Sequence, residues 1–336
     1  MNVYVCVTLY HVFFSLIKIY CEGGNRNSNI IFLNANNEKV YNQYCYIGNQ
    51  LKKRGFACDV RLRSLKGEIL GIENKKNRQQ LRIVYEKMRK EHINEFTLYN
   101  FAWNNSYIYP SAGLLYKKAK SVILIEESTL IAKLGQEKKW KKIVHRLLGD
   151  VVDFYKDAKL ESIMVTRPDD YPSSWSEKLQ KVDIKNYIDV LNDSDKEEIF
   201  TIMSSEGKTV IDALKEPGYG IVYTCPFSEQ NIISEEEKVR QVVKICEYYA
   251  KYAKVMLKLH PRDNSKYPVN GDVVIIPAMF PSELLSMISY EFEFAVSVCS
   301  SAVNTTNAKH KINMNESFYN NPVFKLLDIN GNEVEK

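Results

Sequence analysis

Short apolar runs alternate with longer stretches of mixed polar and apolar residues along the first half of the chain. Five runs have the length and the β-branched or aromatic content of buried strands: Val3–Val7, Ile30–Leu33, Ala57–Leu62, Thr97–Asn100 and Ser121–Ile125. The intervening stretches are long enough for helices, and such alternation is typical of a parallel sheet covered on both faces. The pattern therefore predicts an α/β domain over residues 1–165.

The same alternation starts again after residue 218. Strands are expected at Gly220–Thr224, Val255–Leu259, Val273–Pro277 and Phe294–Val298. Ser234 followed by three glutamates indicates the start of a helix that runs to about Ala253, because a serine cap and an acidic first turn complement a helix N-terminus. We therefore expect a second, nucleotide-sugar-binding domain over residues 219–314.

Two further segments complete the predicted organisation. Residues 166–218 are rich in proline and charge, and we interpret them as a linker with a short helical piece. Residues 315–336 are a C-terminal segment for which we expect packing back on the first domain. Two successive α/β halves favour the GT-B architecture, two Rossmann-like domains with a central cleft, in which ligands bind at strand carboxyl ends. A single large doubly wound domain is the alternative.

Composition narrows the class of protein. Residues 1–20 are apolar but lack a basic leader and a small-residue cleavage site, so we expect a strand running into a helix, and a cytoplasmic protein. The seven cysteines are scattered without a CxxC pair, which argues against a zinc site or a disulfide framework. The formal net charge of +5 is modest for 336 residues and does not indicate a nucleic-acid partner.

The first candidate site lies at Lys258-Leu259-His260-Pro261, at the carboxyl end of a predicted strand. Pro261 ends the strand, so His260 is expected at the rim of the sheet rather than in its core. There it can donate a hydrogen bond to a phosphate oxygen or, when protonated, neutralise charge on a departing nucleotide. A purely structural histidine is the alternative, which the flanking lysine and proline disfavour.

Two more elements follow in order. Glu283 lies in the first turn of a predicted helix, where it either accepts hydrogen bonds from ribose hydroxyls or only stabilises the helix dipole. Ser300 and Ser301 follow the next strand, where small hydroxyls and free backbone N–H groups suit a phosphate, although a simple helix cap is the alternative.

Residues 219–306 resemble the C-terminal half of the bacterial sialyltransferases of glycosyltransferase family 52. The resemblance is carried by the order and spacing of five segments: Tyr223–Glu229, Ile233–Val239, Lys258–Asp263, Phe280–Leu285 and Ser300–Ala302. It implies a GT-B fold, the donor CMP-sialic acid, and no metal or other cofactor. It also implies that His260, Ser300 and Ser301 bind the phosphate of CMP, that Glu283 binds the ribose, and that Lys258 and Pro261 lie near the nucleotide.

The acceptor side is expected in the first domain. Glu126 and Glu127 end a predicted strand, and desolvation or mutual repulsion can make one of two adjacent carboxylates a general base. Similar sialyltransferases have an acidic-acidic-glycine motif here, but Ser128 replaces the glycine. Glu229 is the reserve candidate for the base. His11 is a candidate for the acceptor cleft, with a locally satisfied helix-start histidine as the alternative.

Residues 138–148 place apolar residues at helical spacing between basic ones. Such a helix is suited either to the core or to an anionic membrane, so we expect a lipid-linked acceptor and peripheral contact with the inner face of the membrane as one option. A second copy of the chain is a further candidate partner.

Taken together, the residues and the resemblance predict an inverting, metal-independent transfer of sialic acid from CMP-sialic acid to a galactose-type hydroxyl of a bacterial capsule or lipooligosaccharide. Two rivals remain open. CDP-glycerol glycerophosphotransferases share the order of the HP and SS elements, and a degenerate relative would bind nucleotide or glycan without turnover.

Overall fold

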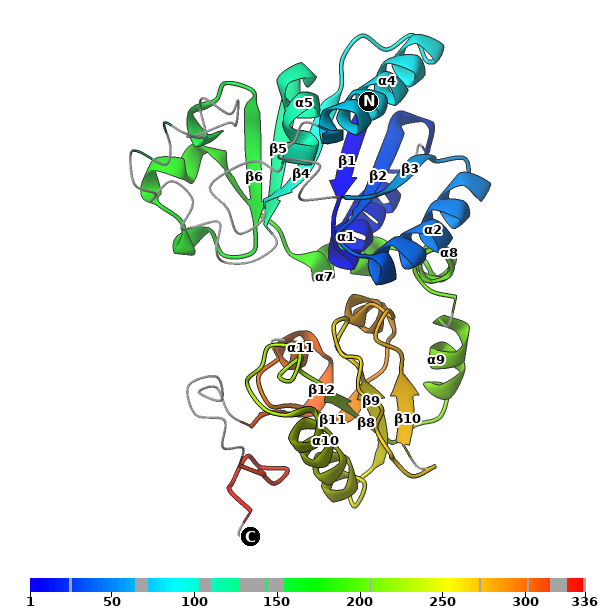
Figure 1. The fold of residues 1–336 in the computed structure, drawn as a ribbon, viewed down its shortest axis with the longest axis vertical. Helices are drawn as coiled ribbons and strands as arrows, with labels where there is room; N and C mark the ends of the chain where they lie inside the picture. The colour runs from blue at the N-terminus through cyan, green and yellow to red at the C-terminus, as the bar shows by residue number, and fades with distance from the viewer. Residues whose placement is uncertain are drawn as a thin grey trace. The chain divides into compact units, whose positions relative to one another are not determined.

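The structure is a computed structural model of the 336-residue chain. It describes residues 1–23, 26–63, 72–102, 110–126, 140, 143, 154–205, 207–271, 273–300, 302–314 and 325–334. The chain divides into two compact units, Met1–Ile202 and Met203–Lys336. Each unit is built around its own parallel sheet (Figure 1).

The first unit has a seven-stranded sheet with the order β3-β2-β1-β4-β5-β6-β7, and all its pairings are parallel. Its strands are β1 (Asn2–Cys6), β2 (Asn29–Ala35), β3 (Ala57–Leu62), β4 (Thr97–Ala102), β5 (Ser121–Glu126), β6 (Leu160–Val165) and β7 (Leu179–Lys181). The first six follow the Rossmann order, in which the direction of strand addition reverses between β1 and β4.

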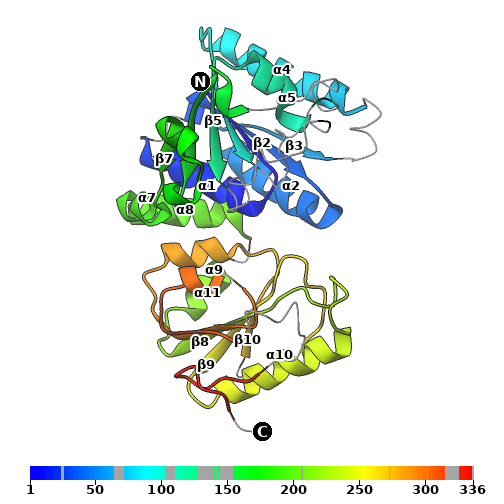
Figure 2. The same ribbon diagram turned by 90° about the vertical axis from the view of Figure 1, so that its left-hand side faces the viewer.

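Helices cover both faces of this sheet (Figure 2). The helices are α1 (Leu9–Cys21), α2 (Glu38–Lys53), α4 (Ile72–Lys90), α5 (Pro110–Lys118), α7 (Ile184–Val190) and α8 (Asp193–Met203). Val3 and Val5 of β1 share a buried core with Val84 of α4 and Leu115 of α5. Cys6 faces the other way, where its sulfur lies 3.5 Å from the hydroxyl of Ser15 in α1. The period of two along β1 thus divides the strand between two helical layers.

The second unit has a five-stranded parallel sheet with the order β10-β9-β8-β11-β12. Its elements are β8 (Tyr219–Tyr223), β9 (Lys254–Lys258), β10 (Val273–Ile276), β11 (Phe292–Ser297), β12 (Ala308–Asn313), α9 (Gly207–Ala213), α10 (Glu235–Tyr249) and α11 (Ala302–Thr305). Gly220 of β8 is needed for packing, because a Cβ atom there would lie 2.2 Å from the ring of Phe294. Ser234 caps α10 by accepting a hydrogen bond from the N–H of Glu237 at 3.1 Å, as the sequence predicted.

The two Rossmann-like domains confirm the predicted fold class, since the GT-B architecture is built from two such domains. The alternative of one large doubly wound domain is wrong, because the strands form two separate sheets. All nine predicted strands are present. The prediction missed β6, β7 and β12. Strand β12 lies at the edge of its sheet, where exposed lysine and histidine side chains hide the apolar signal of a strand.

The organisation around the predicted linker differs from the expectation. The division between the units falls between Ile202 and Met203, inside residues 166–218. The first unit extends beyond residue 165, because β7 pairs with β6 and adds to the sheet. Helices α7 and α8 also belong almost entirely to this unit.

Residues 325–334 pack on the second unit, whereas the C-terminal segment 315–336 was expected to pack back on the first domain. Of this segment the structure describes residues 325–334. Leu326, Leu327 and Ile329 lie against the core of the second unit. The hydroxyl of Tyr249 in α10 donates a hydrogen bond to the carbonyl of Leu327 at 2.7 Å. The apolar side chains thus bury their surface against α10, and the tyrosine hydroxyl satisfies a backbone carbonyl beside them.

Within the part of the chain that the structure describes, no helix combines the length and the apolar character needed to cross a bilayer.

Candidate functional site

The strands of the second sheet end together at one edge. Ile276, Lys258, Tyr223 and Ser297 lie in one row across β10, β9, β8 and β11. A polar side chain ends or follows each of these strands: Thr224 after β8, Lys258 and His260 at the end of β9, Glu283 after β10 and Ser300 after β11. We refer to these five residues as the polar edge. Because ligands of open α/β sheets bind at strand carboxyl ends, the polar edge is the candidate site.

His260 is held in a defined orientation at this edge. Its backbone N–H donates a hydrogen bond to the hydroxyl of Thr224 at 2.8 Å. Its Nδ1 atom accepts one from the N–H of Arg262 at 3.1 Å. A neutral imidazole with Nδ1 as the acceptor has its proton on Nε2, which makes Nε2 the donor.

The charge state of His260 follows from its surroundings. Burial lowers its pKa to about 4, and the positive charges of Arg262 and Lys258 act in the same direction. The histidine is therefore neutral at pH 7 in the free protein. Of the two roles expected from the sequence, the geometry favours the neutral hydrogen-bond donor over a permanently charged partner for phosphate.

Lys258 connects the ends of β9 and β10. The residue is only 2% exposed, and its ammonium group donates to the backbone carbonyls of Leu259, Pro277 and Ala278, the last two at 3.2 and 3.4 Å. These carbonyls belong to the loop that leads to Glu283. Lys258 therefore positions this loop as well as adding positive charge near the edge.

Glu283 lies in the first turn of η6 (Ser282–Met287). Burial raises the pKa of its carboxyl group, while a hydrogen bond that the carboxylate accepts from its own backbone N–H and the charge of Lys258 act against this increase. A partly desolvated carboxylate of this kind is a strong acceptor for hydroxyl groups.

Ser300 has a structural role at this edge. Its N–H donates to the hydroxyl of Ser297 at 2.8 Å, and its own hydroxyl accepts from the N–H of Ala302 at 3.3 Å, at the start of α11. Helix capping is therefore at least part of its role. Ser301 lies outside the described residues.

A buried ion network that the sequence reading missed supports the loop after β9. Lys238 of α10 is 1% exposed and contacts Glu229 at 2.8 Å and Asp263 at 3.0 Å. Asp263 also accepts hydrogen bonds from the hydroxyl of Tyr267 at 2.7 Å and the N–H of Ser265 at 3.0 Å. The network joins α10 to the segment containing His260. Helical periodicity offered a signal, because Lys238 shares the buried face of α10 with Val242 and Ile245.

Glu229 is part of this network, which bears on its candidacy as a reserve base. Burial acts to raise its pKa, but the ion pair with Lys238 and the N–H of Asn264 hold the value at about 2. Its carboxylate is thus a permanent anion in a salt bridge. This environment favours a positioning role over proton abstraction.

Glu126 is likewise engaged in structure. It ends β5 and is 7% exposed. One carboxylate oxygen accepts from the N–H and the hydroxyl of Thr166, both at 2.6 Å, and the other accepts from the hydroxyl of Tyr171 at 2.6 Å. Three donors from the segment after β6 thus occupy both oxygens. Glu127 and Ser128 lie outside the described residues.

His11 is fully buried in α1. Its Nδ1 accepts from the N–H groups of Val7 at 3.0 Å and Thr8 at 3.4 Å, and its ring stacks on Phe101 at 4.0 Å between centroids. These contacts fit the alternative of a locally satisfied helix-start histidine. Of residues 138–148, the structure describes Trp140 and Ile143, which are 60% and 57% exposed.

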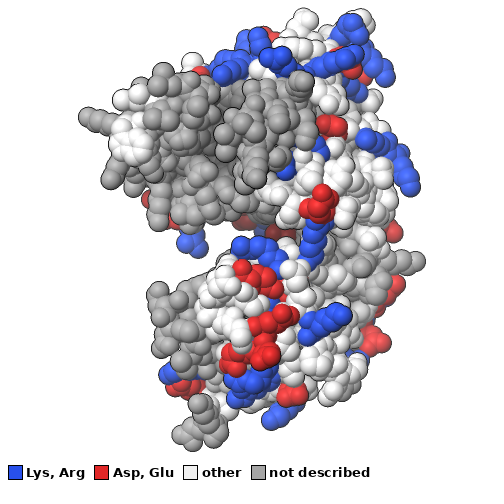
Figure 3. All heavy atoms as spheres, viewed as in Figure 1, with Lys and Arg blue, Asp and Glu red and all other residues white. Residues whose placement is uncertain are grey.

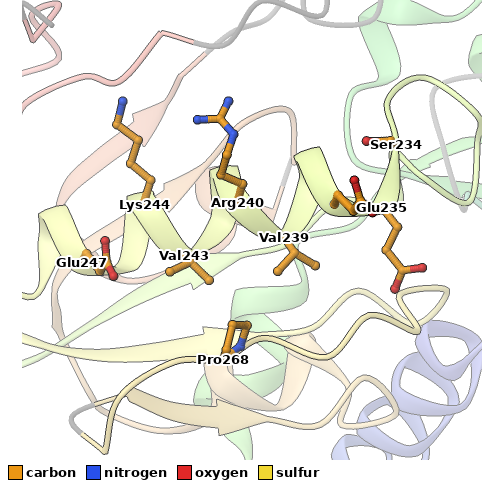
Figure 4. A pocket seen from close by; sticks show the side chains of 9 residues that line it. Ser234, Glu235, Val239, Arg240, Val243, Lys244, Glu247 and Pro268 are labelled. Atoms are coloured by element: carbon orange, nitrogen blue, oxygen red, sulfur yellow. The ribbon is translucent and has the colours of Figure 1, made fainter.

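A hollow of about 960 Å³ lies along α10 (Figure 4). Val239, Val243 and Pro268 provide its apolar part, and Arg240 and Lys244 of α10 also line it. None of the polar-edge residues lines it, so it is not the candidate site. Elsewhere in the described ranges, no group of three or more His, Cys, Asp or Glu side chains is placed to hold a metal ion.

No protein-family model matches the chain. An uncharacterized protein of Haemophilus influenzae is 26% identical over 193 residues, which are 57% of this chain. The match spans 61% of the length of that curated relative.

Two solved structures show broad coverage at low similarity. One is a UDP-N-acetylglucosamine 2-epimerase from Rickettsia bellii, 12% identical, with a TM-score of 0.41 over 95% of this chain and 80% of the other. The other is the spinosyn rhamnosyltransferase SpnG, 11% identical, with a TM-score of 0.40 over 90% and 76%.

Proposed function

We propose that the chain is a glycosyltransferase that binds the nucleotide of its sugar donor at the polar edge. The observation that carries this proposal is the row of strand ends that brings Thr224, Lys258, His260, Glu283 and Ser300 to one edge of the second sheet. A neutral imidazole donor and a desolvated carboxylate there suit the phosphate and ribose of a nucleotide, and the buried ammonium of Lys258 holds the loop that leads to Glu283.

CMP-sialic acid is the donor that we propose, on the resemblance of residues 219–306 to the family 52 sialyltransferases. In the reaction, an acceptor hydroxyl oxygen forms a bond to the anomeric carbon while the bond from that carbon to the phosphate of CMP breaks. The hydroxyl proton passes to a general base. Negative charge grows on the leaving phosphate, where the Nε2–H of His260 would stabilise it.

The proposed base is Glu127 or Glu126. Both oxygens of Glu126 already accept hydrogen bonds from Thr166 and Tyr171. Substitutions at Glu126 and Glu127 should therefore have different effects, which shows which of the two is the base. Glu127→Gln should remove turnover and leave stability unchanged. Glu126→Gln should act first on stability.

The test is a donor panel with the purified protein. CMP-sialic acid, CDP-glycerol and UDP-N-acetylglucosamine are each incubated with lactose, and release of CMP, CDP-derived CMP or UDP is measured. Turnover of CMP-sialic acid alone supports the proposal. Turnover of CDP-glycerol alone would show that the protein is a polyol-phosphate transferase instead. Absence of release with every donor, together with no binding of CMP by calorimetry, would overturn it.

Nucleotide binding without turnover is the second candidate function. It is favoured by one observation: the carboxylates of Glu126 and Glu229, two of the three expected bases, are both held by neighbouring donors. Tight binding of CMP with no product on lactose, N-acetyllactosamine or a lipooligosaccharide acceptor would support it.

A further inference from the structure

Helix α4 (Ile72–Lys90) has two chemically distinct faces. Leu81, Val84 and Met88 are buried in the core of the first unit. On the outer side, Arg78, Arg82, Tyr85 and Arg89 follow one another at helical spacing and are exposed. We refer to these four residues as the α4 face. Together with Leu81 and Glu86 they line a hollow of about 570 Å³.

Positive charge is concentrated on this helix. Its sequence has seven basic and two acidic residues, a net charge of +5, which equals the net charge of the whole chain. The rest of the chain is therefore balanced. Figure 3 shows lysine and arginine side chains gathered over α4. The neighbouring end of α5, which packs beside α4, adds the exposed Lys117 and Lys118.

The arginines of this face are poorly neutralised. Arg82 pairs with Glu86 at 2.8 Å. Arg78 and Arg89 pair with no carboxylate among the described residues. An unbalanced row of charges creates a field that reaches about a Debye length, roughly 10 Å at 0.1 M salt.

We propose that the α4 face docks the protein on an anionic lipid bilayer. The row runs over 12 residues, from Arg78 to Arg89, about 16 Å along one exposed helix face, and a row of this length suits an extended charged surface. Tyr85, 45% exposed, lies in the middle of the row. Tyrosine has an apolar ring and a polar hydroxyl and is enriched at the level of lipid headgroups, whereas an acidic protein or a duplex nucleic acid does not require it. The α4 face contains none of residues 138–148 and does not depend on the reaction proposed above.

The test uses the full chain and vesicles of defined composition. Binding is measured by co-sedimentation with phosphatidylcholine vesicles and with vesicles of phosphatidylcholine and phosphatidylglycerol at three to one. The variant Arg78→Gln/Arg82→Gln/Arg89→Gln is compared with the control Lys52→Gln/Lys53→Gln/Lys185→Gln, which removes the same charge from exposed positions elsewhere in the first unit. Circular dichroism and thermal melting check that both variants fold.

We expect binding to the anionic vesicles alone, about 100-fold weaker in the α4 variant, nearly unchanged in the control, and decreasing with salt. In a Tyr85→Trp variant, the added tryptophan emission should shift to shorter wavelength on anionic vesicles. Equal binding by the two triple variants would overturn the proposal. So would retention on heparin or a 30-nucleotide RNA without any binding to the anionic vesicles, which would assign the α4 face to nucleic acid.

Discussion

The carboxyl edges of the two sheets contain similar residues, a histidine and glutamates next to small hydroxyls, but the surrounding structure uses them differently. In the second unit, backbone groups and Thr224 hold His260 and leave its Nε2–H as a donor. In the first unit, Glu126 is enclosed by Thr166 and Tyr171, and His11 accepts from two backbone N–H groups inside the core. A polar residue at a strand end indicates a site only if the fold neither uses its hydrogen-bonding atoms, as at Glu126, nor buries them in the core, as at His11.

The largest effect is expected at His260. The substitution His260→Ala should lower the rate of CMP release by about 10³-fold, or about 4 kcal/mol of transition-state stabilisation, because a hydrogen-bond donor to the leaving phosphate is lost. Thermal stability should change little. The matched control is His310→Ala, at an exposed position on β12. Equal rates for wild type and His260→Ala would remove the polar edge from the mechanism.

The next effect concerns the ion network behind the polar edge. Lys238→Met should lower the free energy of unfolding by about 3 kcal/mol, because Glu229 and Asp263 would remain as neighbouring anions without a counter-charge. Urea unfolding measures this. Adding Asp263→Asn to Lys238→Met should recover part of the loss, and Lys244→Met, exposed on the same helix, serves as the control. If Lys238→Met proves as stable as wild type, the network does not hold the loop.

A smaller loss is expected in the first unit. Glu126→Gln should lower the free energy of unfolding by about 2 kcal/mol, since an amide cannot accept all three hydrogen bonds from Thr166 and Tyr171. Tyr171→Phe should also lower the free energy of unfolding. The control Glu161→Gln, at an exposed position on β6, should leave it unchanged. A Glu126→Gln protein with full stability and no turnover would instead identify Glu126 as a catalytic base and would erase the contrast between the two edges.

The smallest effect is a dependence of stability on pH. The pKa of His260 is about 4 in the folded protein and 6.5 when unfolded, so the unfolded state binds the proton first as the pH falls. His260 should therefore cost about 1 kcal/mol of stability at pH 5.5 relative to pH 7.5, increasing towards pH 4. Urea unfolding of wild type and His260→Gln at both pH values measures the difference. A direct check is the imidazole titration by NMR, where a midpoint near 6.5 would contradict the assigned burial.

The fold class could be predicted from local periodicity, because the alternation of apolar and polar residues depends only on neighbouring positions. Neighbouring residues were enough to predict nine strands and the helix cap at Ser234. They also gave the order of the segments around His260, Glu283 and Ser300. Strand β12 could not, because its lysines and histidine obscure the apolar alternation of an edge strand.

Which polar side chains are already held by hydrogen bonds or ion pairs depends on contacts between residues far apart in the sequence. Glu126 meets its partners 40 and 45 residues away in sequence, and Lys238 meets Asp263 25 residues away. Such distant pairings leave no trace in local spacing, because they arise from the way parallel strands bring their following loops to one edge. The tertiary structure likewise placed Leu327 on α10 and kept His260 neutral through burial, both of which depend on neighbours that the linear chain does not reveal.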